Sequence, residues 1–234
     1  MSEAAPGPSL PAEELAAADA VRRLAQGLIG RTVDPALSAE VAATVEQLVA
    51  RVEVEPPRTK AEAFSSYPDH NAHKRFAEDG EWPDRPVEGQ PISFDALSFV
   101  AGRLSPLSTD EVFRRAGDDA VARIRFGPLH EGPPTRVHGG MLAAVFDEAM
   151  GAALRVADIP PCFTASLSVR YEAAAPLGVE LTFRARVSGV DGRKVYLSGE
   201  GIGPDGRFTS AEGLFIKVPL DVIHNVMEDG SASP

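Results

Sequence analysis

The chain has 234 residues, of which 44% are hydrophobic, so it is long enough to bury a sizeable core. Its 34 acidic residues outnumber its 23 lysines and arginines, and the net charge of -11 argues against non-specific binding of nucleic acids or of anionic membranes. A single cysteine, Cys162, excludes an internal disulfide and any zinc site built from several cysteines.

The opening residues, MSEAAPGPSLPAEEL, lack the basic start and the continuous apolar run of a secretion signal. No stretch of the sequence approaches the length that is needed to span a bilayer. We therefore expect a soluble, cytoplasmic protein that does not insert into a membrane.

Two amphipathic helices are predicted near the N-terminus, over residues 11–30 and 35–52. Both segments carry apolar residues at helical spacing, with charge on the opposite face and a proline near the start. Helices this short do not form a core of their own, so we expect their apolar faces to pack on the rest of the chain or on a partner subunit. Residues 53–83 are rich in proline and charge and are predicted to be a linker or an extended arm.

Short runs with strand character begin near Asp119. The first is DAVARIRFG, and four more follow a long apolar segment: FTASLSVRYEA, VELTFRARVSGV, KVYLSGEGI and RFTSAEGLFIKV. The turn signals PLG, VDGR and GPDG separate these last four. The order predicts one strand, a buried helix and then an antiparallel meander.

The predicted helix, residues 139–156, is apolar on nearly every face. Between Gly139 and Leu154 its only ionisable residues are Asp147 and Glu148. A helix of this kind is buried nearly all round, so a strongly curved sheet is expected to wrap it. Glu148 lies about 100° around the helix from Asp147, and we expect it to pair with Arg155 or another cation, or to face solvent.

The same helix carries the parts of a catalytic site. Gly139 and Gly140 allow close approach to its N-terminal end, where unpaired N–H groups can stabilise negative charge that develops on an oxygen. Asp147 lies about 12 Å further along, at ~1.5 Å per residue. A carboxylate buried there needs hydrogen bonds, water or a catalytic role.

The segments EGPPTRVHGGMLAAVFDEAMG, FTASLSVRYEAAAPLG, GRKVYLSGEG and GLFIKV resemble the hotdog-fold acyl-CoA thioesterases of the 4-hydroxybenzoyl-CoA and phenylacetate-type superfamily. The resemblance is closest to the branch similar to C-terminal modulator protein, and it covers roughly residues 95–219. It implies an α+β hotdog fold, an antiparallel sheet wrapped around a long central helix. Residues 1–94 are then an N-terminal helical extension and linker arm, and residues 220–234 are a C-terminal tail.

The resemblance also implies the roles of four catalytic residues. Asp147 acts as the nucleophile or, through water, as the general base. The N–H of Gly139 polarises the thioester carbonyl, His138 shapes this oxyanion pocket, and the hydroxyl of Thr164 positions the attacking water. In the family these groups meet across a dimer interface, so a monomer is expected to be inactive. Many phenylacetate-type relatives carry an asparagine where this chain has Gly132, a difference that favours the modulator-protein-like branch.

Further residues are expected to bind the acyl-CoA substrate. No cofactor or metal is expected, since CoA takes part only as a portion of the substrate and product. Arg193 and Lys194 fall where hotdog thioesterases contact the phosphates of coenzyme A, although a basic pair in a turn is often only surface charge. The remaining candidates adjoin the helix end or line the acyl chain: Gly140, Phe146, Phe163, Leu142 and Met150. The partners expected are a second copy in a homodimer, or two dimers in a tetramer, and no nucleic acid.

Other interpretations remain open. Gly201, Gly203 and Gly206 spell GxGxxG but lie between two strands, which indicates a hairpin. His70 and His73 have a spacing found in metal sites, without further ligands beside them. A hotdog dehydratase or hydratase, or a non-catalytic protein that binds an acyl thioester or a protein partner, are the alternatives to a thioesterase.

Overall fold

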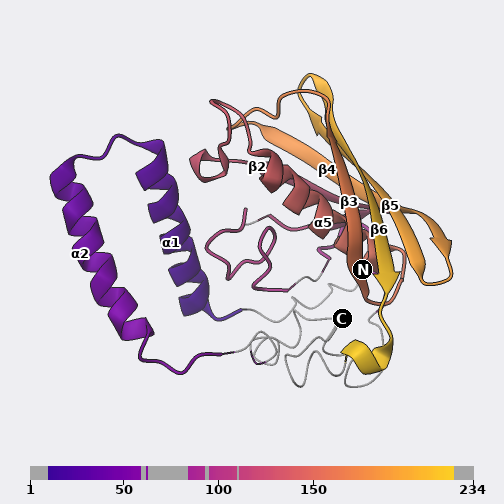
Figure 1. Cartoon of the computed structure of the whole chain (residues 1–234), viewed down its shortest axis with the longest axis horizontal. Coiled ribbons are helices and arrows are strands. Elements are labelled where there is room, and N and C mark those ends of the chain that lie inside the picture. The colour runs from indigo at the N-terminus through magenta and orange to yellow at the C-terminus, as the bar shows by residue number, and fades with distance from the viewer. Residues whose placement is uncertain (1–9, 59–61, 63–83, 93–94, 110, 224–234) are drawn as a thin grey trace, which may run out of the picture.

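The computed structural model describes residues 10–58, 62, 84–92, 95–109 and 111–223 (Figure 1). Most of the predicted linker arm, with His70 and His73, lies outside these residues. The helices are α1 (Ala12–Gly30), α2 (Pro35–Val52) and α5 (Gly139–Val156), with a short 3₁₀ helix η2 (Pro128–His130). The strands are β1 (Arg114–Ala116), β2 (Asp119–Arg125), β3 (Cys162–Tyr171), β4 (Glu180–Asp191), β5 (Lys194–Gly203) and β6 (Gly206–Lys217).

The six strands form one antiparallel sheet in the order β1-β2-β4-β5-β6-β3. The predicted meander is therefore correct for β4 to β6 and wrong for β3, which pairs with β6 and lies at the edge of the sheet. The connection from Tyr171 to Glu180 crosses from that edge to β4, a distance of about three strand spacings or ~14 Å. Its eight residues can span this distance.

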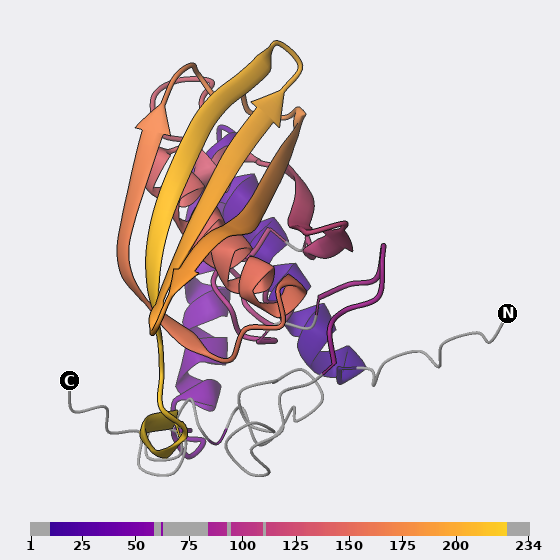
Figure 2. The ribbon, with the colours of Figure 1, turned by 90° about the vertical axis from the view of Figure 1, so that its right-hand side faces the viewer.

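The sheet curves around α5, as predicted from the apolar surface of that helix (Figure 2). Glycines in the central strands let the helix approach closely. A Cβ atom at Gly213 would lie 2.5 Å from the sulfur of Met150, and one at Gly199 would lie 2.9 Å from the ring of Phe146. Phe183 stands at the centre of this core and makes edge-to-face contacts with three other aromatic rings, those of Phe126, Phe146 and Phe208.

Both N-terminal helices form over the predicted residues, but only α1 packs on the domain. Its Arg22 is 9% exposed and donates to the hydroxyl of Ser108 and to the carbonyls of Arg103 and Ser105. Gln26, one turn later, accepts the N–H of Leu129 at 3.0 Å.

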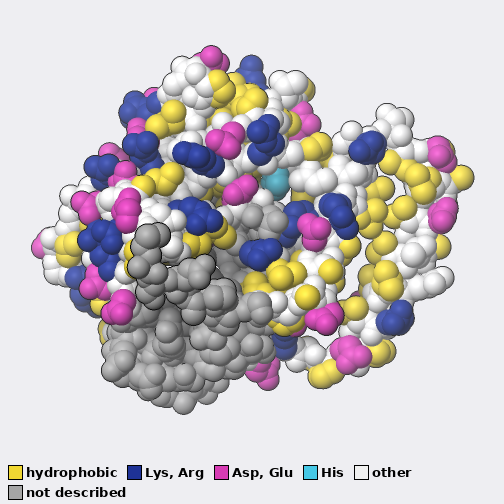
Figure 3. Space-filling model, turned by 180° about the vertical axis from the view of Figure 1, so that it is seen from behind, with side chains coloured by type: hydrophobic (Ala, Val, Ile, Leu, Met, Phe, Trp, Pro, Cys, Tyr) yellow, Lys and Arg dark blue, Asp and Glu magenta, His cyan; other side chains and the backbone are white. Residues whose placement is uncertain are grey.

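The α2 helix has no buried residue, although Asp34 caps its start with two hydrogen bonds. Its aliphatic side chains remain exposed, among them Leu37, Leu48 and Val52. Figure 3 shows α1 and α2 as two separate arms with apolar side chains along both. Among the described residues, packing of the apolar face on the domain thus holds for α1 and not for α2, and packing of α2 on a partner subunit stays a prediction.

We expect Arg22→Ala to lower the free energy of unfolding by about 1 to 3 kcal/mol, because it removes hydrogen bonds from a buried charged group. Arg23→Ala is the matched control. The Arg23 side chain is 74% exposed and meets only Asp19 at 3.7 Å, so its loss should have almost no effect. Urea unfolding of both variants measures the difference, and equal stabilities would contradict the docking role of α1. Deletion of residues 1–53 should likewise lower stability.

Candidate active site

Thr164 reaches Asp147 because β3 contains a β-bulge. Leu167 and Val169 pack against the core, which places alternate residues of this strand on the face toward α5. The register with β6 shifts between Thr164 and Ser166, and an extra residue in a strand reverses the alternation beyond it. Thr164 therefore lies on the helix face, where its hydroxyl donates to Oδ1 of Asp147 at 2.7 Å.

The N-terminal end of α5 holds a backbone N–H that no acceptor occupies. His138 is the N-cap residue: its Nδ1 accepts the N–H of Gly140 at 3.0 Å, and its carbonyl accepts those of Met141 and Leu142. Within the described part of the chain, the N–H of Gly139 has no such partner. Because the start of a helix carries partial positive charge, this amide is a donor for an oxygen that becomes negatively charged.

Tyr171 joins the other end of β3 to the same helix end, a contact that the sequence analysis missed. Its hydroxyl donates to the carbonyl of Gly139 at 2.9 Å. A Cβ atom at Gly139 would lie 3.3 Å from the phenol carbon and oxygen, so the ring packs directly on this glycine. Thr164 and Tyr171 are seven positions apart, so strict alternation would place their side chains on opposite faces of β3. The bulge brings both side chains to the face toward the helix.

The two halves of the predicted site are separated in the single chain. Gly139 and Asp147 are eight residues apart on one helix, about 12 Å along its axis. One carbonyl group cannot lie about 3 Å from both the amide and the carboxylate. Strand β3 carries Thr164 at one end and Tyr171 at the other. It pairs with β6 on one side, and no strand among the described residues lies on its other side.

Glu148 does not pair with a cation as predicted. Its carboxylate oxygens accept the backbone N–H groups of Val100 and Ala101 at 2.7 and 2.9 Å. The guanidinium of Arg155 instead donates to the carbonyl of Asp84 at 3.1 Å. Glu148 thus anchors residues 95–109 to α5, on a different side of the helix from Asp147.

Burial raises the pKa of Glu148 above its ordinary value of 4.5, although the hydrogen bonds from the backbone of Val100 and Ala101 oppose the shift. Glu148 therefore contributes stability that is present below pH 4.5 and is lost as the pH rises through the raised pKa. We expect the melting temperature of the wild type, relative to that of Glu148→Gln, to fall as the pH increases from 4.5 to 7. Melting curves followed by circular dichroism measure this difference.

The control for this titration is Glu172→Gln. A hydrogen bond from Ser210 is the largest of the effects that lower the pKa of Glu172, so its contribution is present above pH 4.5 and is lost as the pH falls through the lowered pKa. Between pH 4.5 and 7 the Glu172 comparison should therefore stay flat while the Glu148 comparison falls. Parallel slopes would contradict the burial of the Glu148 carboxylate.

The structure places most of the predicted acyl-lining residues in the core. Phe146, Met150 and Leu142 are 0%, 0% and 3% exposed, because their side chains fill the space between α5 and the sheet. The assignment of these three side chains to a substrate surface is therefore incorrect for the single chain. Phe163 is half exposed, but it precedes Thr164 by one residue and so lies on the outer face of β3.

Arg193 lies in the turn between β4 and β5, and Lys194 is the first residue of β5; both are exposed. Lys194 pairs with Ile216 of β6, which in turn pairs with Phe163. The turn therefore lies at the end of the sheet where β3 begins, about two strand spacings or ~10 Å from it. Nε of Arg193 donates to the carbonyl of Lys217 at 3.3 Å.

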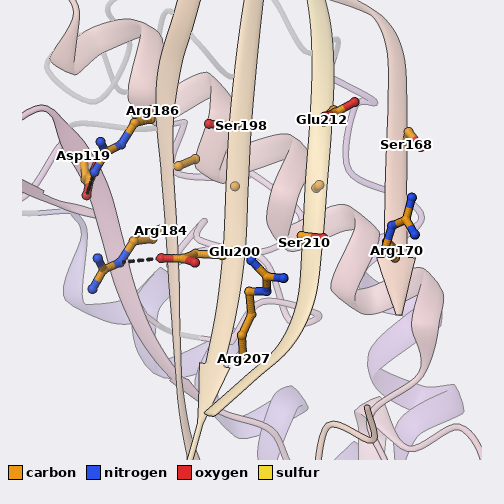
Figure 4. Close-up of a pocket in the computed structure, with 13 residues that line it drawn as sticks. Asp119, Ser168, Arg170, Arg184, Arg186, Ser198, Glu200, Arg207, Ser210 and Glu212 are labelled. Atoms are coloured by element: carbon orange, nitrogen blue, oxygen red, sulfur yellow. Dashed lines mark hydrogen bonds and ion pairs between the residues drawn. The ribbon is translucent and has the colours of Figure 1, made fainter. Parts of the chain in front are cut away.

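A groove on the outer face of the sheet contains none of the predicted site residues (Figure 4). Its arginines face acidic side chains: Arg186 is 2.6 Å from Asp119, and Arg184 is 3.5 Å from Glu200. Arg207, at one end of the groove, lies 3.0 Å from Glu172. Because these ion pairs neutralise three of the four arginines that line the groove, Arg170 being the fourth, we assign no phosphate site to it.

Cys162 and the remaining motifs supply no competing site. Burial raises the pKa of the Cys162 thiol to about 11, so it is not an activated nucleophile at neutral pH.

Gly206 has a φ of 107° in the β5–β6 hairpin turn, and Gly201 and Gly203 lie in β5, as the hairpin interpretation predicts. Within the described residues there is no group of three or more potential metal ligands, and no helix there is long and apolar enough to cross a membrane.

Part of the chain is similar to known thioesterases. Residues 135–208 match the family model of the thioesterase superfamily. The acyl-coenzyme A thioesterase THEM4 of Xenopus laevis is 34% identical over 108 residues, which are 45% of this chain and 48% of that protein. THEM4 of Bos taurus is 26% identical over 166 residues, which are 60% of this chain and 68% of that protein. The chain thus spans about half the length of the Xenopus relative.

A crystal structure of a thioesterase superfamily protein superposes with a TM-score of 0.69 at 24% identity, covering 91% of this chain and 94% of the other. At this identity the likeness concerns the fold alone. It confirms the α+β hotdog fold that the sequence predicts, an antiparallel sheet around a central helix with an N-terminal helical part. The segment that contains the cap, the helix and β3 is thus similar to the thioesterase superfamily.

Proposed function

We propose that the protein is an acyl-CoA thioesterase, which hydrolyses an acyl-CoA thioester to a free acid and CoA. The observation that carries this proposal is the 2.7 Å hydrogen bond from Thr164 to Asp147, on a helix whose first N–H has no acceptor among the described residues. The relatives named acyl-coenzyme A thioesterase support the same reaction and the same substrate class.

The hydrogen bond from Thr164 leaves one carboxylate oxygen of Asp147 available for the reaction. Because the Thr164 hydroxyl occupies one lone pair of Oδ1, Oδ2 of Asp147 remains available to accept a proton from water or to attack directly. In the water route, the water oxygen adds to the thioester carbon while Asp147 takes its proton. The oxyanion then accepts the Gly139 N–H, the C–S bond breaks, and the departing thiolate takes the proton that Asp147 holds, which restores the carboxylate.

The proposed enzyme is a homodimer with two composite sites. The 12 Å between Gly139 and Asp147 rules out a site within one chain, and β3 offers ten residues of unpaired edge for a second copy. An antiparallel, two-fold pairing that sets Thr164 of one copy beside Tyr171 of the other brings Asp147 of the first to Gly139 of the second. Two identical sites then form, one at each end of the paired strands.

Arg193 and Lys194 are proposed to bind the phosphates of CoA. Their turn lies at the end of the sheet where Thr164 enters the site, and in the described structure Arg193 makes only a weak bond to a carbonyl. Phosphate oxygens would offer both side chains stronger, charge-assisted partners.

The dehydratase alternative requires a histidine that acts as the base. The Nδ1 of His138 already accepts the N–H of Gly140, which leaves this histidine in a capping role. A non-catalytic role does not explain a carboxylate and a hydroxyl paired beside a free helix-end amide.

The test is the release of free thiol from a panel of acyl-CoAs of different chain length, together with a 3-hydroxyacyl-CoA. Thiol release that depends on the protein supports the thioesterase. Formation of an enoyl product from the 3-hydroxyacyl-CoA without thiol release would establish a dehydratase instead. Binding of acyl-CoA without either product would establish the non-catalytic alternative.

A further inference from the structure

One peptide group connects Tyr171 to His138. The carbonyl of Gly139 accepts the Tyr171 hydroxyl at 2.9 Å. The N–H of Gly140, which belongs to the same peptide group, donates to Nδ1 of His138 at 3.0 Å. A phenol and an imidazole are thus bonded to the two ends of a single amide. Hydrogen bonds in such a chain polarise one another, so each bond strengthens the other.

The bond from Gly140 determines where the proton of the neutral imidazole lies. Since Nδ1 accepts from an N–H, it carries no hydrogen, and the proton is on Nε2. The other ring tautomer would point an N–H at the N–H of Gly140 and would remove the cap. His138 is exposed, so its Nε2–H is a donor on the accessible side of the helix end.

The bond from Tyr171 determines the orientation of the same turn. The ring packs on Gly139, where even a Cβ atom would be 3.3 Å from the phenol group. The hydroxyl fixes the carbonyl of Gly139, and the backbone of this residue therefore has little freedom to rotate. Its own N–H keeps no acceptor within the described residues and continues to point away from the helix.

We propose that Tyr171 is a positioning residue of this site, which acts through the Gly139–Gly140 peptide group to hold the Gly139 N–H in place and His138 in its Nε2–H tautomer. The inference rests on the proposed thioesterase function. The hydroxyl of Tyr171 then affects turnover although it does not contact the reacting atoms. In the two-fold pairing proposed above, this tyrosine lies beside Thr164 of the second copy, and so orients the donors that face the partner's Asp147.

The first experiment is Tyr171→Phe, which removes the hydroxyl and keeps the ring on Gly139. We expect kcat for acyl-CoA hydrolysis to fall by a factor of about 2 to 10, the range for the loss of one neutral hydrogen bond, with little change in KM. Tyr196→Phe is the matched control, because Tyr196 is an exposed tyrosine on the outer face of β5 and its variant should keep wild-type turnover. Equal turnover in the two variants would overturn the proposal.

A second experiment separates positioning from general loosening of the fold. His138→Asn keeps a cap for the Gly140 N–H but has no imidazole tautomer. If Tyr171 acts through His138, adding Tyr171→Phe to this variant should lower kcat by less than it does in the wild type. The same fold-change in both backgrounds would show that the tyrosine does not act through the imidazole of His138.

The third readout does not depend on activity. Nitrogen-15 NMR of the imidazole should find His138 in the Nε2–H tautomer in the wild type and in Tyr196→Phe, and an increased Nδ1–H fraction in Tyr171→Phe. An unchanged tautomer in Tyr171→Phe would overturn the connection through the peptide group. If the wild type released no thiol, the thioesterase function would be rejected, and with it the effect of Tyr171 on turnover. The NMR measurement would still show whether Tyr171 and His138 are connected through the peptide group.

Discussion

Replacing Asp147 by Asn is expected to lower kcat for acyl-CoA hydrolysis by a factor on the order of 10² to 10⁴, the usual effect of losing a general base. Asparagine keeps the size of the side chain and can still accept the hydroxyl of Thr164 at its amide oxygen. The variant therefore loses the ability to take a proton or to attack, while the helix and the sheet edge remain in place. Binding of acyl-CoA, measured by calorimetry, should survive.

Two neighbours provide graded controls for this loss. Thr164→Ala should lower kcat less than Asp147→Asn does, because it removes a positioning hydroxyl and keeps the carboxylate. Glu148→Gln should change kcat least, since the Glu148 side chain binds the backbone of Val100 and Ala101 on another side of the helix. Near-normal turnover in Asp147→Asn together with loss of turnover in Glu148→Gln would reverse the assignment of the two carboxylates.

The central helix could be predicted from the sequence because its signal is local. The helix has eighteen residues, 139–156, and its only charged side chains are two carboxylates and Arg155 in the last turn, so it requires burial on nearly every side. The HGG run and the two N-terminal helices were likewise visible, since caps, prolines and helical periodicity act over a few residues. The resemblance to hotdog thioesterases supplied the roles of Asp147 and Thr164, which helix periodicity alone does not give.

The edge position of β3 could not be predicted in this way. Consecutive strands usually lie side by side, and nothing local in the sequence from Tyr171 to Glu180 indicates a crossing over two other strands. The bulge in β3 is also invisible in the pattern TASLSVRY. Its consequence is large, because it turns Thr164 toward Asp147 and puts Tyr171 on the same face.

The partners of Glu148 and the exposure of α2 depend on contacts distant in sequence. Glu148 accepts two N–H groups from residues almost 50 positions earlier, 48 and 47 positions away, in a segment with no helix or strand pattern to place it. The α2 helix has a well-formed cap and an apolar stripe, and these local features do not specify which surface covers the stripe.

Two inactive variants are expected to restore activity to one another when they are mixed. Gly139→Pro removes the free N–H but suits the first position of a helix, and His138 already has φ -62° and ψ 133°, a conformation that a following proline allows. Gly139→Ala is the matched control: it adds a Cβ atom near Tyr171 in the same way but keeps the N–H. Gly139→Pro should therefore lose a further factor on the order of 10² to 10³ relative to Gly139→Ala.

In a dimer with composite sites, a copy that carries Asp147→Asn and a copy that carries Gly139→Pro form one doubly damaged site and one intact site. The intact site combines Asp147 of the second copy with Gly139 of the first. Random exchange of subunits makes about half of the dimers mixed, each with one working site of two, so activity should rise to about one quarter of wild type under two-fold symmetry. Each variant alone stays at its low level. If the mixture stays as inactive as its components while mass spectrometry detects mixed dimers, each site lies within a single chain and the composite arrangement is wrong.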